Sequence, residues 1–150
     1  MNKLITIFTI FFYLLPIMTI ANTEENIWDI YYSDSQVVIS TTKIACEYNY
    51  KFNQELIIIK IQNITSNDLI VEWDNKLWYD ESCVNCKEDN IEFKNKIKIE
   101  SGNEIIGNCS ENNNLRIFSK FTENIEDMPG VTKITKLTKF KFENIKIENE

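Results

Sequence analysis

Apolar and polar residues alternate along much of the chain, and this alternation constrains the fold more than any other feature. In the segment IEFKNKIKIE (91–100), positions 91, 93, 97 and 99 are apolar, whereas every even position from 92 to 100 carries a charge. The segment DLIVEWD (68–74) repeats the pattern. Successive side chains of a strand point to opposite faces, so each segment predicts a strand with one buried face. No stretch has a convincing helical period, and we expect an all-β fold.

Short polar segments separate the apolar runs and predict turns between strands. NITSND (63–68) and SGNE (101–104) are rich in turn-forming residues, and we expect each to close a hairpin. In the last run, Phe140 and Phe142 have one parity and Ile145 and Ile147 the other, which predicts a bulge or bend near Asn144. We expect strands near residues 27–32, 36–45, 54–63, 68–79, 91–100, 104–109, 115–121 and 134–148.

The first 21 residues, MNKLITIFTIFFYLLPIMTIA, have the order of a secretory signal peptide. Lys3 precedes a mostly apolar run, and small and polar residues lead to a cleavage site after Ala21. A membrane anchor is the alternative, but Pro16 and the threonines interrupt the run before it reaches about 20 apolar residues. We therefore expect a secreted or periplasmic protein in which residues 22–150 form a single domain, with no membrane association after cleavage.

The whole chain is acidic, with a formal net charge of −7, and removal of Lys3 with the signal makes the remaining domain more acidic. An acidic surface repels phosphate backbones and anionic lipid headgroups. We therefore expect no nucleic-acid partner, and we expect the domain to be a monomer.

Four segments together cover most of residues 22–150 and resemble a known architecture. They are LIIIKIQNITSNDLIVEWD, the following LWYDESCVNC, KIKIESGNEIIGNC and LRIFSKF. This combination resembles the immunoglobulin-like modules of small secreted bacterial proteins, uncharacterised proteins of the type found in Bacteroidota. The resemblance implies an immunoglobulin-like antiparallel β-sandwich of about 7–8 strands, and it implies no activity and no catalytic residue.

Counting strand reversals from residue 54 places all four cysteines, Cys46, Cys83, Cys86 and Cys109, at one end of the predicted fold. In a secreted protein, four such thiols usually form two disulfides. We favour bridges from the 83–86 segment to Cys46 and Cys109, because longer closed loops restrict the unfolded chain more. The alternative is a local bridge between Cys83 and Cys86.

Two other roles for these cysteines are weaker. C-x-x-C is a usual half of a four-cysteine zinc site, but here the other two ligands would be isolated cysteines, and the secretory route favours oxidation. A redox C-x-x-C normally opens a helix, whereas CVNC follows a predicted strand and is flanked by carboxylates, which raise the pKa of a thiol. We expect no metal and no other cofactor.

The sequence also lacks the groups of common enzymes. It contains no histidine, so no Ser-His or Cys-His pair and no imidazole metal site exists. Three glycines leave little room for a phosphate-binding loop. The pairs Asp80-Glu81 and Glu88-Asp89 do not have the spacing of a calcium loop, and we interpret them as solvated loop charges. We predict no catalytic residue and no enzymatic activity.

Binding is the remaining class of function. Trp73, Leu77 and Tyr79 share the core parity, so Trp78 should point outward beside the cysteine loop, where a rigid aromatic side chain can anchor a partner. Alternatively, Trp78 packs under the 80–90 loop or across the second sheet. We predict a binding module for an unknown protein or carbohydrate ligand. Its candidate contact residues are Trp78, Tyr79, Asp80 and Glu81. Two alternatives are inhibition of a secreted hydrolase through the 78–90 loop and thiol–disulfide exchange at CVNC.

Overall fold

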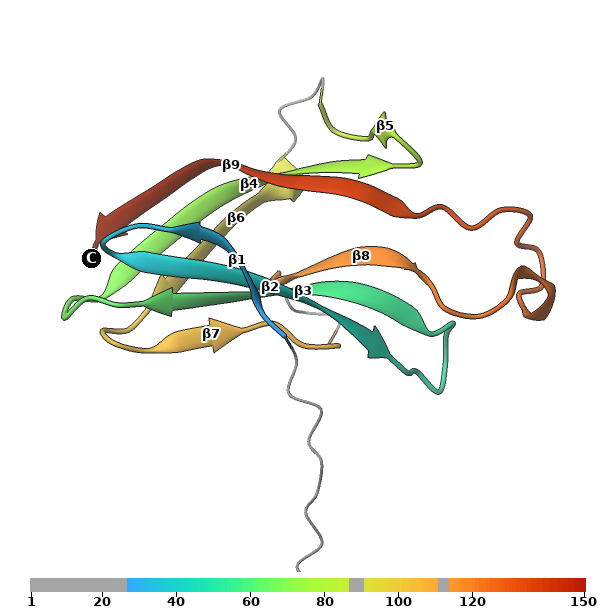
Figure 1. The fold of residues 1–150 in the computed structure, drawn as a ribbon, viewed down its shortest axis with the longest axis horizontal. Helices are drawn as coiled ribbons and strands as arrows, with labels where there is room; N and C mark the ends of the chain where they lie inside the picture. Colours follow the sequence, from blue (N-terminus) through green and yellow to red (C-terminus); the bar gives the residue numbers. More distant parts are fainter. Residues whose placement is uncertain (1–26, 87–90, 111–113) are drawn as a thin grey trace, which may run out of the picture.

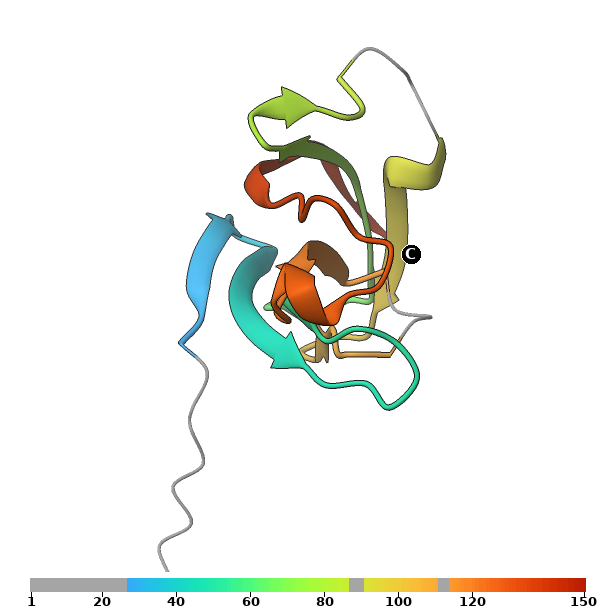
Figure 2. The same cartoon turned by 90° about the vertical axis from the view of Figure 1, so that its right-hand side faces the viewer.

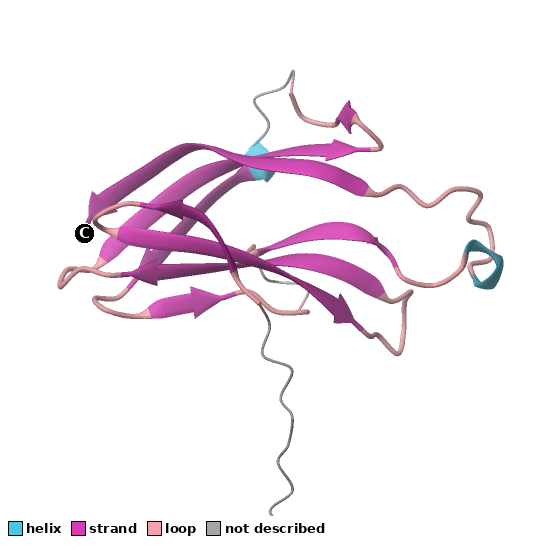
Figure 3. Ribbon diagram, in the orientation of Figure 1, coloured by secondary structure: helices cyan, strands magenta, loops and turns pink. Residues whose placement is uncertain are grey.

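The protein is built from antiparallel sheets packed in two layers (Figures 1 and 3). The computed structural model describes residues 27–86, 91–110 and 114–150, and the predicted signal peptide (1–21) lies outside them. Sheet 1 contains β1 (Asp29–Ser33), β2 (Val37–Cys46), β3 (Gln54–Asn63), β7 (Glu104–Ile106) and β8 (Arg116–Phe121). Sheet 2 contains β4 (Leu69–Tyr79), β5 (Ser82–Cys83), β6 (Lys94–Ile99) and β9 (Leu137–Asn149).

The predicted all-β class is confirmed. The described residues form only two short 3₁₀ helices, η1 (Ile91–Phe93) and η2 (Ile125–Asp127), and none of them forms a helix long and apolar enough to cross a membrane. Each of the eight predicted strands has a counterpart, and β5 is an additional two-residue strand.

The core lies between the two sheets, where the alternating apolar side chains of facing strands meet. Burial alternates along β4 as expected, with Leu69, Val71, Trp73 and Leu77 inside. The inward residues Ile57, Ile59 and Ile61 of β3 belong to the same cluster. Full burial of an aliphatic side chain contributes about 1.5–3 kcal/mol, so this shared interior favours the two-layer arrangement.

The prediction that the turns at 63–68 and 101–104 close hairpins is wrong. Each turn carries the chain from one sheet to the other: β3 and β7 pair within sheet 1, whereas β4 and β6 pair within sheet 2. Alternation shows which face of a strand is buried, but two strands that bury their apolar faces in one core need not be paired with each other.

Asn63 joins the two crossing turns. Its side chain is 1% exposed, and its amide nitrogen donates to the carbonyls of Asn67 (2.8 Å), Ile99 (3.2 Å) and Glu100 (3.1 Å). Its side-chain oxygen accepts from the backbone N–H (2.9 Å) and the hydroxyl (2.8 Å) of Thr65. A buried amide is tolerated when its donors and acceptor are satisfied, and here one side chain satisfies backbone groups of both turns.

β7 and β8 form one interrupted strand along β3. The N–H of Ile59 donates to the carbonyl of Leu115, and its carbonyl accepts from the N–H of Gly107, both at 2.9 Å. The chain therefore leaves sheet 1 after Gly107 and returns to it at Leu115. Both of these residues bond to the same residue of β3, Ile59. A Cβ atom at position 107 would lie 2.0 Å from the Leu115 carbonyl oxygen, so the close approach requires glycine.

The bulge expected near Asn144 is confirmed. Asn144 has a φ of 53°, and the pairing of β4 with β9 shifts register between Glu72 and Asp74. The bulge lets Phe142 on one side of it and Ile145 on the other both pack against the core, although their sequence parities differ.

β1 lies on the flank of the two layers beside β2, as the end-on view shows (Figure 2). Its Tyr31 reaches sheet 2, where the ring packs against Phe140 and Phe142 with centroid distances of 5.6 and 4.4 Å. The Tyr31 hydroxyl accepts the N–H of Phe142 at 2.9 Å. β1 thus covers part of the β9 edge, which would otherwise present unpaired backbone groups.

The preferred disulfide pairing is wrong, and the local alternative is confirmed. The bridges join Cys46 to Cys109 and Cys83 to Cys86. The crossing at 63–68 assigns β4 and the 83–86 segment to sheet 2, whereas Cys46 ends β2 in sheet 1. The first bridge belongs to a small second cluster, built on buried Cys46, Leu56 and Ile58. The 83–86 segment is therefore cross-linked only to itself.

Candidate functional site

Three connections lie at the end of the molecule that is opposite the C-terminus (Figure 1). They are the β2–β3 loop (47–53), the turn after β4 and the long β8–β9 connection (122–136). Apolar side chains are exposed at this end, Tyr50 at 73%, Val84 at 55% and Ile125 at 39%. Loops on a rigid sheet scaffold are common binding surfaces, and this end contains the predicted contact residues.

The turn that follows β4 has an unusual backbone. Asp80 and Glu81 connect β4 to β5 in a two-residue hairpin, with Tyr79 paired to Ser82. Both residues have positive φ, 46° and 67°. This geometry suits Asn-Gly, and a residue with a Cβ in the left-handed region costs about 1–2 kcal/mol. The hairpin is therefore strained and needs support from its surroundings.

The segment that precedes β9 supplies this support. The Asp80 carboxylate accepts the N–H of Lys136 (3.1 Å) and forms an ion pair with Lys133 (2.6 Å), and its own N–H donates to the Lys136 carbonyl (3.0 Å). The hydrogen bond from Lys133, followed by that from Lys136, holds the pKa of Asp80 below its usual value. The N–H of Glu81 donates to the Thr138 hydroxyl (3.1 Å). Asp80 thus fixes the turn.

Asn85, inside the C-x-x-C motif, takes the place of a neighbouring strand. β6 pairs with β4 only as far as Asp74. Beyond that point the Asn85 side chain, 3% exposed, donates to the Asn75 carbonyl (2.5 Å) and accepts the N–H of Leu77 (3.0 Å). Sequence analysis missed this role. The available signal was an amide residue between two cysteines, shortly after the strand that it contacts.

Tyr79 faces the interior. Its hydroxyl donates to the Phe118 carbonyl at 2.6 Å, and the two rings stack with centroids 6.3 Å apart. Burial raises the pKa of Tyr79 to about 12. This contact joins sheet 2 to sheet 1 at the loop end, so the side chain holds the layers together rather than facing solvent.

Trp78 lies on the face of β4 opposite the core residues Trp73 and Leu77, as its parity predicts. It is half-buried, and it is paired with Cys83 on one side and Lys139 on the other. The Lys139 ammonium lies 4.7 Å from the centroid of the indole ring, a favourable cation–π distance. The outward Trp78 and the exposed Val84 are the apolar side chains of this corner, which we define as residues 78–86.

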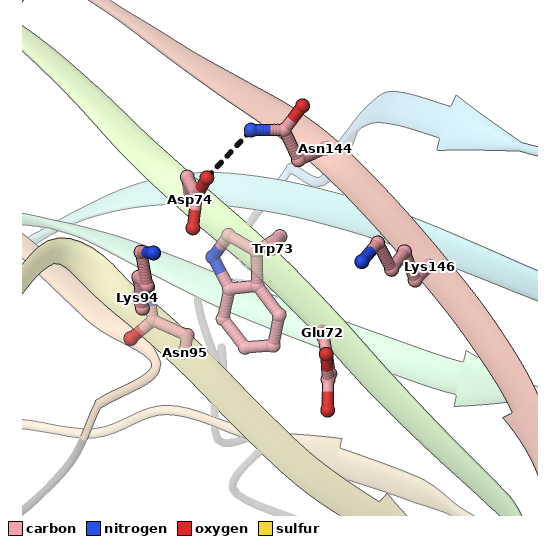
Figure 4. A pocket seen from close by; sticks show the side chains of 7 residues that line it. All are labelled: Glu72, Trp73, Asp74, Lys94, Asn95, Asn144 and Lys146. Atoms are coloured by element: carbon pink, nitrogen blue, oxygen red, sulfur yellow. Dashed lines mark hydrogen bonds between the residues drawn. The ribbon is translucent and has the colours of Figure 1, made fainter. Parts of the chain in front are cut away.

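A second candidate is a polar groove of about 480 Å³ over the bulge between β4 and β9 (Figure 4). Asn144 donates to Asp74 at 2.6 Å across it, and Glu72 forms an ion pair with Lys96 at 2.7 Å. Trp73 is only 2% exposed and donates its indole N–H to Asn75, so its ring offers no stacking surface. The two carboxylates of the groove, Glu72 and Asp74, are thus already engaged within the protein. The groove is lined by Glu72, Trp73, Asp74, Lys94, Asn95, Asn144 and Lys146.

The described part of the chain contains no group of three or more acidic, histidine or cysteine side chains placed to hold a metal ion. The four cysteines lie in two separate bridges rather than around a shared centre. No protein-family model, curated protein or solved structure matches the chain.

Proposed function

We propose that the protein is a non-enzymatic binding module that contacts its ligand, a protein or a carbohydrate, through the 78–86 corner. The observation that carries this proposal is the placement of Trp78 on an outward face beside a cross-linked, strained turn. Exposed Val84 lies on the same corner. Tryptophan is enriched at binding hot spots because its large ring combines an apolar body with a polar N–H.

The fixed geometry of the corner supports this proposal energetically. Ordering a flexible side chain on binding costs about 0.5–1.5 kcal/mol, and a surface that is already ordered avoids this cost. The Asp80–Lys133 ion pair, the Cys83–Cys86 bridge and the bonds of Asn85 each restrict the corner before any ligand arrives. A strained turn that is held in this way is typical of functional loops.

We further propose that the protein is exported, cleaved after Ala21 and monomeric in the periplasm or outside the cell. Two disulfides favour an oxidising compartment. The proposed relationship is to immunoglobulin-like modules of small secreted Bacteroidota-type proteins. When β7 and β8 are counted as one strand and β5 is omitted, the two sheets contain four and three strands. This division supports the proposed relationship. The pairing of β2 with β3 in one sheet departs from the strand order of antibody constant domains.

Two alternative functions use the same corner: inhibition of a secreted hydrolase through the 78–90 loop and thiol–disulfide exchange at Cys83 and Cys86. The position of Asn85 favours the binding module over both. Its side chain is buried against β4, so the centre of the motif is not displayed as an extended segment for a protease. Opening of the bridge would also loosen these bonds.

The proposal is tested with protein from an exporting bacterial host on an array of neutral and acidic oligosaccharides and in a protein-ligand screen. Trp78→Ala should weaken any detected interaction at least tenfold, because hot-spot truncations cost about 2 kcal/mol or more. Tyr50→Ala is the matched control, since it removes an exposed aromatic from a neighbouring loop. A ligand lost with Tyr50→Ala and kept with Trp78→Ala would move the site to the 47–53 loop.

Parallel assays distinguish the alternatives. Inhibition within a panel of secreted proteases that disappears in Trp78→Ala would replace the proposal with the inhibitor. Turnover in an insulin-reduction assay that disappears in Cys83→Ala would replace it with thiol–disulfide exchange.

A further inference from the structure

The outward face of sheet 2 has a balanced half, formed by the three rows of side chains nearest the C-terminus. In each row a residue of β4 lies between partners on β6 and β9. Glu72 lies between Lys96 and Lys146, and it forms an ion pair with Lys96 at 2.7 Å. The other two rows also hold both signs of charge, and the three rows together carry four lysines and four carboxylates. The remaining charged residues of these rows are Lys94, Lys98, Asp74, Glu143 and Glu148.

The other half of the same face adjoins the 78–86 corner and is cationic. Lys76 lies directly opposite Lys141, and Trp78 lies opposite Lys139. These two rows hold three lysines and no carboxylate. Glu143, from the next row, pairs with Lys141 at 2.8 Å. Like charges directly opposite each other destabilise a sheet, and here Glu143, which attracts both Lys141 and Lys76, offsets part of their repulsion.

The sequence around β9 extends the cationic region. Residues 128–142 contain Lys133, Lys136, Lys139 and Lys141 and no acidic residue, in a chain whose net charge is −7. Lys43 of β2 also reaches this edge, where it lines a cleft of about 100 Å³ together with Thr138 and Lys139. Lys133 is engaged by Asp80, so the basic charge beside Trp78 comes mainly from Lys76, Lys139 and Lys141.

We propose that this cationic strip, defined as Lys76, Lys139 and Lys141, binds a short acidic saccharide, whose sugars carry carboxylate or sulfate groups. The inference rests on the proposed function of the adjoining corner and specifies its ligand class. Each ammonium has three donors, and Lys76 directs one of them to the Asn85 carbonyl (2.9 Å), which leaves donors for a ligand. Lysine-rich patches are a known basis of heparin binding.

The geometry suits repeated anionic groups on a flat surface. Outward side chains of one strand are spaced at about 6.6–6.8 Å, and neighbouring strands lie about 4.8 Å apart, so the three ammonium groups form a shallow array rather than a pocket. The array is small and borders rows that contain carboxylates. A short acidic saccharide can remain within it, whereas a nucleic acid would extend over acidic surface and be repelled.

The test uses a heparin hexasaccharide, which carries sulfate, and a hexamer of galacturonic acid, which carries only carboxylate. Binding to the protein from an exporting host is measured by calorimetry between 50 and 200 mM salt. The double variant Lys139→Gln/Lys141→Gln should bind about 25-fold more weakly, at roughly fivefold per lysine near an anionic surface. Lys96→Gln/Lys98→Gln is the matched control, because it removes the same charge from the balanced half of the same face.

The salt dependence gives a second readout. For three contacts, the slope of log affinity against log salt should be about −2, and it should fall to about −0.7 in Lys139→Gln/Lys141→Gln. The control should keep the full slope and bind within twofold of the unmodified protein. A preference between the two hexamers identifies sulfate or carboxylate as the recognised group.

Four results would overturn the inference: no binding of either hexamer at 50 mM salt, equal loss in the control variant, equal binding of uncharged maltohexaose, or tighter binding of a hexaglutamate peptide. Failure of the proposed function of the corner can be distinguished from failure of this inference. If the lysine variant abolishes hexamer binding and Trp78→Ala does not change it, the cationic strip stands and the corner is not the contact surface.

Discussion

Removal of the two disulfides, one at a time, should have very different effects on stability. The Cys46–Cys109 bridge closes a sequence separation of 63 residues, and the Cys83–Cys86 bridge closes only 3. The loss of chain entropy on closing these loops corresponds to about 4 kcal/mol for the long loop and about 1.5 kcal/mol for the short one. Cys46 is also buried beside Leu56 and Ile58, so alanine is the replacement that keeps this cluster apolar.

The assay is urea denaturation of Cys46→Ala/Cys109→Ala, of Cys83→Ala/Cys86→Ala and of the unmodified protein. The first variant should lose roughly 2–3 kcal/mol more free energy of unfolding than the second. An equal loss, or a larger loss for the 83–86 variant, would refute the argument that the long bridge stabilises the fold and the short one only shapes the corner. Far-UV circular dichroism before denaturation shows whether each variant keeps its sheets.

Three further predictions concern single residues. Asn63→Ala should lower the free energy of unfolding by about 3 kcal/mol, because buried backbone groups of two turns lose their partner, whereas Asn67→Ala, which removes an exposed side chain, should change it little. Glu81→Gly should stabilise the protein by roughly 0.5–1 kcal/mol in the same assay, since glycine relieves the positive φ; a loss of stability would contradict the strain. The raised pKa of Tyr79, about 12 against a usual 10.0, favours the neutral phenol in the folded state. The resulting stability is present below pH 10 and is lost as pH rises through 12, so the urea midpoint should fall more between pH 9 and 11.5 in the unmodified protein than in Tyr79→Phe. Equal falls would show that Tyr79 does not contribute.

Strand positions were predictable because burial imposes alternation. In a run such as 68–79, only one face of the strand is apolar, so only that face can be buried. The same reasoning located the bulge at Asn144, where the parity of the apolar residues changes. The pairing of strands was not predictable from this signal. A turn between two alternating strands is compatible with a hairpin and with a crossing to the other sheet, and the choice here depends on the buried contacts of Asn63.

The candidate site was predictable to a similar extent. Parity placed Trp78 outward and Tyr79 inward, and the cysteine spacing located the corner. The local disulfide followed from the sheet crossing, which alternation does not reveal. The clustering of Lys76, Lys139 and Lys141 depends on the register of β4 with β9, two strands about 60 residues apart in sequence. Pairing over such a distance is specified by the whole core rather than by local sequence.

A map of amide shifts in the ¹⁵N-labelled protein, on addition of the heparin hexasaccharide, tests the central claim that the corner and the adjoining strip form one binding surface. We expect the largest changes at the Trp78 indole N–H and at the amides of residues 76–84 and 139–141. Changes confined to the 47–53 loop or to sheet 1, or no change at millimolar hexasaccharide, would contradict it.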